Sequence, residues 1–495
     1  MTATPVTPTT AAQAPARADL RVVAARSDRL GADLTDLGVD EGFAEAAGFG
    51  GQANQTLLLP AGGPGPDTLL VGVGEEAGVD GNRLRAAAGA AGRKVTRHRK
   101  VVVALGEKAA DGTSREHVAQ AVAEGWVLGA YRFDGHRSKP SEVEVTSVVL
   151  TAGAAKVAKD AVARGVALAR AVNLARDLVN EPGGSLLPAD LAARVKAVGA
   201  EVGLKVKVDG LAAIKRRGLG GLAGVAQGAT NEPRFVEIAY EPKGKPTGHV
   251  ALVGKGVTFD TGGYSLKTSD GMKGMNGDMG GAAAVIGAMS VLGTLGVKVK
   301  VTGYLPLVEN MIGPDAIRVG DVLTTRGGTT VEVQNTDAEG RLILADGLRV
   351  ASEAEPDAII DLATLTGACM VALGPRVAGL FGSDDGLVGR IHAVADAAGE
   401  SVWPMPMPEH LRAGLDSDIA DLRNISGGRH AGASVAALFL RHFVGDGIAW
   451  AHLDIAGPSW ITDSAQGEVP KLGTGFGVRL LTDLLAGWEP LPASG

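Results

Sequence analysis

The feature that most constrains this chain is the run Asn-Thr-Asp-Ala-Glu-Gly-Arg-Leu at residues 335–342. Residues 329–334 alternate as a strand does, and residues 342–350 place apolar side chains at helical spacing. Asp337 and Glu339 are therefore expected on a strand-to-helix turn, where α/β sheets usually bind ligands. Taken alone, the run also has a structural interpretation, because Thr336 and Glu339 have the spacing of a helix capping box.

A second acidic cluster upstream favours the functional interpretation. Residues 249–253 predict a strand that ends at Gly-Lys-Gly around Lys255, and Asp260 and Asp278 follow, the latter just before a helix of small residues. If these carboxylates converge with Asp337 and Glu339, they repel one another and take up protons unless cations balance them. Two divalent ions would balance four carboxylates, and a two-metal site activates water while polarising a substrate oxygen.

Both segments resemble the leucine (cytosol) aminopeptidase family of dinuclear metallopeptidases. The most diagnostic string of that family is present unchanged at residues 335–342, and further matching blocks lie at residues 361–368 and 452–457. The resemblance extends from about Asn180 to the C-terminus. It implies an enzyme that releases N-terminal amino acids, preferably leucine-like ones, from peptides.

The resemblance also implies a ligand set for two divalent ions, Mn or Zn, with Mg or Co as alternatives in one site. Asp260 and Glu339 would bridge the two ions. The remaining ligands would be Lys255 and Asp278 on one ion and Asp337 on the other. Lysine must be neutral to donate its lone pair, and we expect two neighbouring divalent ions to expel its proton.

Two further residues carry implied catalytic roles. Lys267 would place its ammonium near the developing oxyanion and stabilise the gem-diolate. Arg341 would hold a bicarbonate that acts as general base, since a guanidinium binds a carboxylate-like anion at two points but cannot itself be the base. None of the nine histidines falls inside either acidic cluster, and His452 is interpreted as a core residue.

The resemblance implies a pocket for the side chain of the substrate's N-terminal residue. It would be lined by Met275, Thr364, Gly367 and Ala456, which form an adaptable apolar wall. Two departures from the family pattern bear on it. Asn276-Gly277 stands where Lys-Tyr is usual, and Thr261 stands where serine is usual. Neither removes a metal ligand, but the first lies beside Met275 and could reshape the pocket.

Composition and periodicity predict an α/β protein of two domains. The 495 residues are 45% hydrophobic and 21% charged, which is enough for large cores. We expect a flexible tail over 1–18, a small α/β domain over 19–153, a linker helix over 154–180 and a larger domain over 181–495. The sequence predicts strands of the small domain at residues 20–25, 68–73, 101–105 and 142–151. In the larger domain, strands alternating with helices predict a mixed, largely parallel sheet covered on both faces.

Charge and cysteine content limit the partners and the location. The net charge of −7 makes attraction to nucleic acid or an anionic membrane unexpected, although residues 93–100 form a short basic run. The uncharged run at 280–297 is interpreted as a core helix, and the chain as cytoplasmic because its start lacks a long apolar segment. The single Cys369 is expected to be buried and inert. The family resemblance implies a homohexamer.

Two alternatives stay open at this point. One is a DNA-binding or regulatory protein on an aminopeptidase fold, which salt-dependent DNA binding would reveal. The other is a Mg-dependent phosphoryl-transfer enzyme, since carboxylate clusters serve there too. The chain lacks a Gly-x4-Gly-Lys-Ser/Thr loop, which counts against the nucleotide-dependent version.

Overall fold

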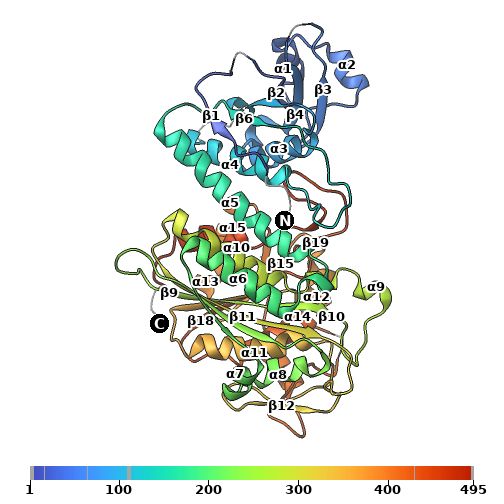
Figure 1. Cartoon of the computed structure of the whole chain (residues 1–495), viewed down its shortest axis with the longest axis vertical. Helices are drawn as coiled ribbons and strands as arrows, with labels where there is room; N and C mark the ends of the chain where they lie inside the picture. The colour runs from blue at the N-terminus through green and yellow to red at the C-terminus, as the bar shows by residue number, and fades with distance from the viewer. Residues whose placement is uncertain (1–4, 16, 64, 109–112, 429, 492–495) are drawn as a thin grey trace. The chain divides into compact units, whose positions relative to one another are not determined.

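The computed structural model describes residues 5–15, 17–63, 65–108, 113–428 and 430–491. The chain divides into two compact units (Figure 1), residues 1–173 with 462–471, and residues 174–461 with 472–495. The boundary falls inside α5 (Lys156–Asn180), which is one continuous helix as the periodicity of residues 154–179 predicted.

The first unit is built on a six-stranded sheet. Its strands are β1 (Thr9–Thr10), β2 (Leu20–Arg26), β3 (Thr56–Leu59), β4 (Asp67–Gly74), β5 (Lys100–Ala104) and β6 (Ser147–Leu150). Their order is β1-β6-β5-β2-β4-β3, and every neighbouring pair is parallel except β3 with β4. The helices of this unit are α1 (Leu30–Asp36), α2 (Glu41–Ala46), α3 (Gly81–Lys94) and α4 (Arg115–Gly129).

The strands predicted at 20–25, 68–73 and 101–105 are confirmed as β2, β4 and β5. The strand predicted over 142–151 is shorter, since β6 begins only at Ser147. The amides of Glu144 and Thr146 donate instead to the carbonyls of Thr96 and Arg99, in the connection that precedes β5. An extended, alternating sequence there pairs with a loop rather than with the sheet.

The second unit contains a nine-stranded sheet. Its strands are β7 (Lys205–Asp209), β8 (Arg234–Tyr240), β9 (His249–Gly254), β10 (Gly256–Asp260), β11 (Lys300–Asn310), β14 (Ala358–Ala363), β15 (Ala378–Gly382), β16 (Val402–Pro404) and β18 (Ala449–Asp454). The order is β16-β15-β18-β14-β9-β11-β8-β7, with β10 paired to β11 off this path. Antiparallel pairs occur only at β15–β18, β11–β8 and β8–β7 in the described sheet, which confirms a mixed, largely parallel arrangement.

Helices cover both faces of this sheet (Figure 1). One face carries α6 (Pro188–Val202), α10 (Gly280–Leu295), α13 (Asp385–Ala398) and α15 (Val478–Ala486). The other carries α7 (Leu211–Arg216), α8 (Gly220–Val225), α11 (Glu339–Ser352) and α14 (Gly432–Arg441). Short strands β12 (Val322–Thr324), β13 (Thr330–Glu332) and β17 (Leu422–Arg423) form a separate small sheet, and β19 (Trp460–Ile461) pairs with β20 (Leu472–Gly473).

The uncharged run at 280–297 forms α10, whose residues are almost all buried, as predicted for a core helix. Among the described residues, no helix has both the length and the apolar character needed to cross a membrane. The core on the α11 side is built from β-branched and leucine side chains of the strands, such as Val253 and Ile359, and from Leu342, Leu344 and Leu348 of α11. This packing holds α11, and with it the run at 335–342, against the sheet.

Candidate metal centre

The candidate site is formed by loops at the carboxyl ends of parallel strands. Lys255 follows β9, Asp260 ends β10, Thr364 follows β14 and Asp454 ends β18. Because β9, β14 and β18 run parallel, their carboxyl ends meet at one edge of the sheet. Segments separated by about two hundred residues in the sequence therefore reach one place.

Glu339 is the first residue of α11, where the helix dipole stabilises a negative charge. The capping box that the sequence allowed is not formed, since Ala338 is the N-cap and has no side-chain capping bond. The Thr336 hydroxyl instead donates to the carbonyl of Gly262 at 2.6 Å and accepts from the amide of Ser265 at 2.7 Å. Thr336 thus ties the Asp337 loop to the Asp260 loop.

Three carboxylates converge as the sequence predicted. One oxygen from each of Asp260, Asp337 and Glu339 lies within 4.8 Å of the other two, the spacing of groups able to hold a metal ion. Asp278 joins them through Lys255, whose Nζ lies 2.9 Å from Asp278 Oδ2 and 3.0 Å from Glu339 Oε1. The structure therefore brings all five predicted ligands together.

Lysine ammonium groups are the counter-ions of this cluster. Besides its two carboxylates, Lys255 Nζ donates to the carbonyl of Thr364 at 2.9 Å. Lys267 Nζ lies 2.9 Å from Asp260 Oδ2 and also forms an ion pair with Asp337. Burial lowers the pKa of each lysine, but the neighbouring carboxylates outweigh it and raise both pKa values.

The electrostatics of the acidic side chains fit a pair of divalent ions. Burial, reinforced by the Asp260 carboxylate, raises the pKa of Glu339 to about 8. Burial also raises the pKa of Asp278, to about 6, against the opposing effect of Lys255. Asp278 Oδ2, Asp337 Oδ1 and Glu339 Oε1 are buried oxygens that face the ammonium groups of Lys255 and Lys267. Two lysines do not neutralise four carboxylates, and carboxylate oxygens with charge left over are what hard divalent cations bind.

Glycine is required at two positions of the site by space. A Cβ at Gly340 would lie 2.6 Å from Cε of Lys255, so only glycine lets the lysine pass beneath the start of α11. Gly262 has φ of +84°, and a Cβ there would lie 2.7 Å from Asp337 Oδ1. Both glycines thus permit close approach of a chain segment to a candidate ligand.

Arg341 lies two residues after Glu339 and is buried. Its Nη1 donates to the carbonyl of Asn424 at 2.7 Å, while its Nε has no hydrogen-bond partner among the described residues. Burial lowers the pKa of the guanidinium to about 10, against the opposing effect of Glu339 and Asp454. A buried, charged donor without an acceptor is suited to an anion.

Of the four residues expected to line the substrate side-chain pocket, Thr364 and Met275 lie beside the predicted ligand Asp278. The Thr364 hydroxyl donates to Asp278 Oδ1 at 2.7 Å, and Met275 opens the short 3-10 turn Met275–Gly277 that leads into Asp278. Gly367 begins α12 (Gly367–Leu373) and the Ala456 amide donates to Asp454 Oδ1 at 3.2 Å. All four are partly or fully accessible, which a substrate-lining role requires.

Two polar residues that organise the site were not singled out by the sequence. Asp454 accepts from the Thr366 hydroxyl at 2.6 Å and from the Ala456 amide, and so holds the ends of β14 and β18 together. Asn424 donates to the carbonyl of Asn335 at 2.7 Å and offers its own carbonyl to Arg341. Asp454 lies in a block that matched the family, but nothing near Asn424 in the sequence signals its role.

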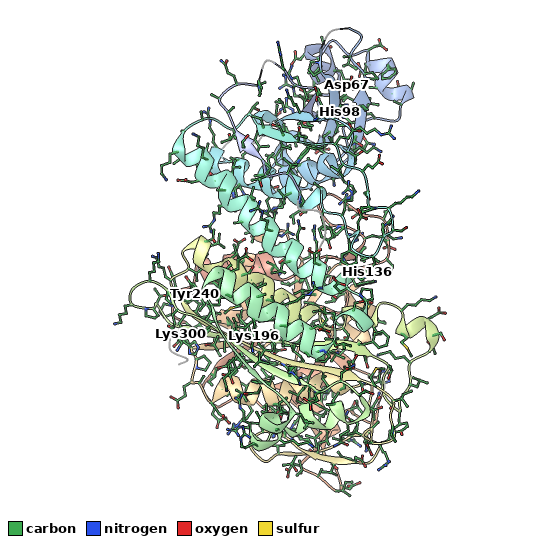
Figure 2. All side chains as sticks on the ribbon, viewed as in Figure 1. Asp67, His98, His136, Lys196, Tyr240 and Lys300 are labelled. Carbon is green, nitrogen blue, oxygen red and sulfur yellow. The ribbon has the colours of Figure 1, made fainter. Side chains whose placement is uncertain are left out.

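Cys369, His452 and two residues of the basic run 93–100 make contacts typical of structural roles. Cys369 is buried, as predicted, and burial raises the pKa of its thiol to about 12, which disfavours the reactive thiolate. His452 is buried and lies 2.6 Å from Asp361 Oδ1, which confirms a core histidine. In the basic run, His98 Nε2 lies 3.0 Å from Asp67 Oδ2 (both labelled in Figure 2), and Arg93 donates to the carbonyl of Val469.

Comparison with known proteins agrees with this geometry. The model of the cytosol aminopeptidase family catalytic domain matches residues 173–482, and that of its N-terminal domain matches residues 41–140. Proteins named "Probable cytosol aminopeptidase" from Rhodococcus jostii (strain RHA1) and Streptomyces coelicolor are 42% and 45% identical to the chain. The first comparison covers 94% of this chain and 92% of the relative, and the second covers 91% of each.

Two solved structures are similar over nearly the whole chain. The bottromycin maturation enzyme BotP in complex with Mn has a TM-score of 0.87 at 40% identity, covering 95% of this chain and 99% of BotP. A tomato leucine aminopeptidase mutant has a TM-score of 0.88 at 33% identity, and the match covers 97% of this chain and 96% of the tomato protein. With both family domains matched in order and the acidic cluster assembled, the chain belongs to the cytosol aminopeptidase family and is a metal-dependent aminopeptidase.

Proposed function

We propose that this aminopeptidase releases leucine-like residues from the N-termini of peptides with two divalent ions held by Lys255, Asp260, Asp278, Asp337 and Glu339. The observation that carries the proposal is the convergence of Asp260, Asp337 and Glu339 oxygens within 4.8 Å. Manganese in the BotP structure supports Mn as one of the ions, and Zn is the other candidate for both sites. A bound pair of ions would supply an acidic water and polarise the scissile carbonyl.

Lys267 is proposed to stabilise the negative charge that develops on the carbonyl oxygen. Carboxylates around it raise its pKa, so it is an ammonium at neutral pH. Its side chain is partly exposed, with 17% of its surface accessible, whereas Lys255 is 4% accessible. Lys267 can therefore face substrate, and the enclosed Lys255 is the one suited to the ligand set.

Arg341 is proposed to hold a bicarbonate that serves as general base. The support is its buried Nε, which no described group accepts from, beside an Nη1 already anchored on Asn424. One anchored nitrogen fixes the plane of the guanidinium, and the remaining donors can bind a planar anion at two points. Arg341 itself only positions this anion.

Preference for leucine-like side chains is proposed from the pocket residues Met275, Thr364, Gly367 and Ala456, which offer apolar and small surfaces around the Asp278 side of the cluster. The catalytic residues all belong to the second unit, so we assign the activity to the proposed catalytic domain, residues 181–495. A cytoplasmic homohexamer is the assembly that we propose from the family resemblance, and light scattering of the purified chain tests the stoichiometry.

The testing experiment is hydrolysis of Leu-p-nitroanilide by metal-stripped protein titrated with Mn²⁺ and Zn²⁺. We expect activity to return with metal in the native chain and to stay absent in Glu339→Ala. A panel of Leu, Ala, Lys and Asp anilides then tests the side-chain preference. Binding of two ions per chain without leucine release would overturn the substrate assignment, and absence of metal binding would overturn the proposal as a whole.

A further inference from the structure

Asn310 is a buried amide at the centre of the acidic cluster that has no role in the assignments above. It ends β11 and is the register partner of Asp260, which ends β10. Its side chain is 1% exposed. Its carbonyl accepts from both the amide and the hydroxyl of Thr261, so its backbone is held in place from the Asp260 loop.

The Asn310 side-chain nitrogen faces only acceptors. Nδ2 lies 2.8 Å from Asp260 Oδ1, 3.0 Å from the carbonyl of Thr336 and 3.4 Å from Glu339 Oε2. An amide oxygen in this position would meet three lone pairs, so the nitrogen must be the atom that points into the cluster. A single neutral group thereby contacts two carboxylates and the residue that precedes Asp337.

We infer that Asn310 is a positioning residue that orients Asp260 and Glu339 for metal binding, an inference that rests on the proposed function. The amide engages one oxygen of each carboxylate and leaves the other oxygen facing a lysine. Asp260 Oδ2 lies 2.9 Å from Lys267 Nζ, and Glu339 Oε1 lies 3.0 Å from Lys255 Nζ. The backbone amide of Gly262 also donates to Asp260 Oδ1, at 2.8 Å, so this oxygen is held from two sides. Asn310 is the group that contacts both carboxylates, and it leaves Asp260 Oδ2 and Glu339 Oε1 for a cation.

The chemistry of an amide suits this position better than that of a charged residue. A carboxylate at position 310 would add repulsion to a cluster in which the pKa of Glu339 is already raised. An ammonium would compete with the metal ions for the same oxygens. An amide supplies donors without charge, and partners of this kind that orient metal ligands typically change affinity about 10- to 100-fold when removed.

The test compares Mn²⁺ binding by the native chain, Asn310→Leu and Asn310→Ala in the full-length protein. Titration calorimetry gives the dissociation constants, and melting temperatures are measured in EDTA and in Mn²⁺. The matched control is Asn231→Leu. Asn231 Nδ2 donates at 2.8 Å to the buried carboxylate of Glu309, the residue that precedes Asn310 in the sequence. Both substitutions remove an amide-to-carboxylate bond, but only one touches the candidate ligands.

We expect Mn²⁺ binding to weaken about 10- to 100-fold in the Asn310 variants and to stay within about twofold of native in Asn231→Leu. The Mn²⁺-induced rise in melting temperature should shrink in parallel. If Asn310→Leu does not fold, Asn310→Ala decides by the same comparison. A lower melting temperature in EDTA with an unchanged dissociation constant would make Asn310 only a structural residue and overturn the inference. A native chain that binds no Mn²⁺ would overturn the proposed function itself.

Discussion

Lys255 Nζ lies 3.0 Å from Glu339 Oε1, and both side chains are almost completely buried. Lys255 lies between β9 and β10, Glu339 begins α11, and Gly340 leaves the space through which the lysine reaches the glutamate. Without an ion, the ammonium of Lys255 offsets the repulsion between the carboxylates of Glu339 and Asp278. A divalent ion that uses Lys255 as a ligand must therefore displace its proton, so metal binding is coupled to proton release.

Stability of the metal-stripped protein should decrease as the pH rises from about 5 to 8. The pKa of Glu339 is raised from 4.5 to about 8 and that of Asp278 from 3.8 to about 6. A carboxyl whose pKa is higher in the folded state favours folding while it is protonated, and this contribution is lost as the pH passes the folded value. The melting temperature in EDTA, measured across this range, checks the direction.

Bound Mn²⁺ should offset the stability that the stripped protein loses at high pH. The rise in melting temperature on adding Mn²⁺ should therefore be larger at pH 8 than at pH 6. Glu339→Gln should reduce the pH dependence of the stripped protein, because it removes the carboxyl whose pKa is raised furthest. Asp278 and the buried Asp346, whose pKa values are raised to about 6 and about 7, still titrate in this range. Glu309→Gln, at a buried carboxyl outside the cluster, is the matched control and should leave the dependence in place. A pH dependence in Glu339→Gln equal to that of the native chain would contradict this account.

Arg341→Ala should lower kcat by about 10²- to 10⁴-fold, the usual contribution of general base catalysis, while two Mn²⁺ ions still bind. Arg341→Lys should recover little of the rate, because lysine keeps the charge but not the two-point geometry. Arg349→Ala, an exposed arginine on the same helix, is the control and should be close to native. Steady-state rates with added bicarbonate and metal analysis of each variant test this; metal loss in Arg341→Ala would reject the assignment.

Asn276→Ala should weaken substrate binding more than it slows turnover. Asn276 Nδ2 donates to the carbonyls of Val179 at 2.9 Å and Glu181 at 3.1 Å, and so anchors the turn that carries Met275. Losing bonds of this kind costs about 1 kcal/mol, so we expect KM for Leu-p-nitroanilide to rise about fivefold with smaller changes for Ala-p-nitroanilide. Lys273→Ala, an exposed position before the same turn, is the control. Equal effects on both anilides would remove Met275 from the specificity pocket.

Asp346→Ala should destabilise the second unit without changing the metal ligands. Asp346 on α11 is fully buried, and its two oxygens accept from the amides of Leu222 and Arg326, each at 2.8 Å. Removing the carboxylate leaves both amides without their acceptor, which costs about 3 kcal/mol. Urea unfolding followed by tryptophan fluorescence measures this loss, and the exposed Asp315→Ala should be neutral. A stability equal to native would show that water replaces the carboxylate.

Much of the architecture could be predicted because local patterns agree with the tertiary structure. Short, nearly continuous apolar runs became β2, β4 and β9, and the periodic stretch after Glu339 became α11. The strand predicted over 142–151 began late, because its first residues bond to a loop that periodicity cannot reveal. The capping box failed for a similar reason, since Thr336 finds a better partner in the carbonyl of Gly262, 74 positions away.

The residues of the candidate site could be proposed from the sequence alone, since an acidic cluster with two lysines and an arginine at strand ends has few uses other than binding metal. How these residues meet could not be predicted. In the folded chain Lys255 is more enclosed than Lys267, Asp278 contacts the cluster through Lys255, and Asn310 lies between Asp260 and Glu339. The physical reason is that parallel strand pairing brings distant loops to one sheet edge, and sheet register, which depends on contacts far apart in the chain, sets which side chains touch there.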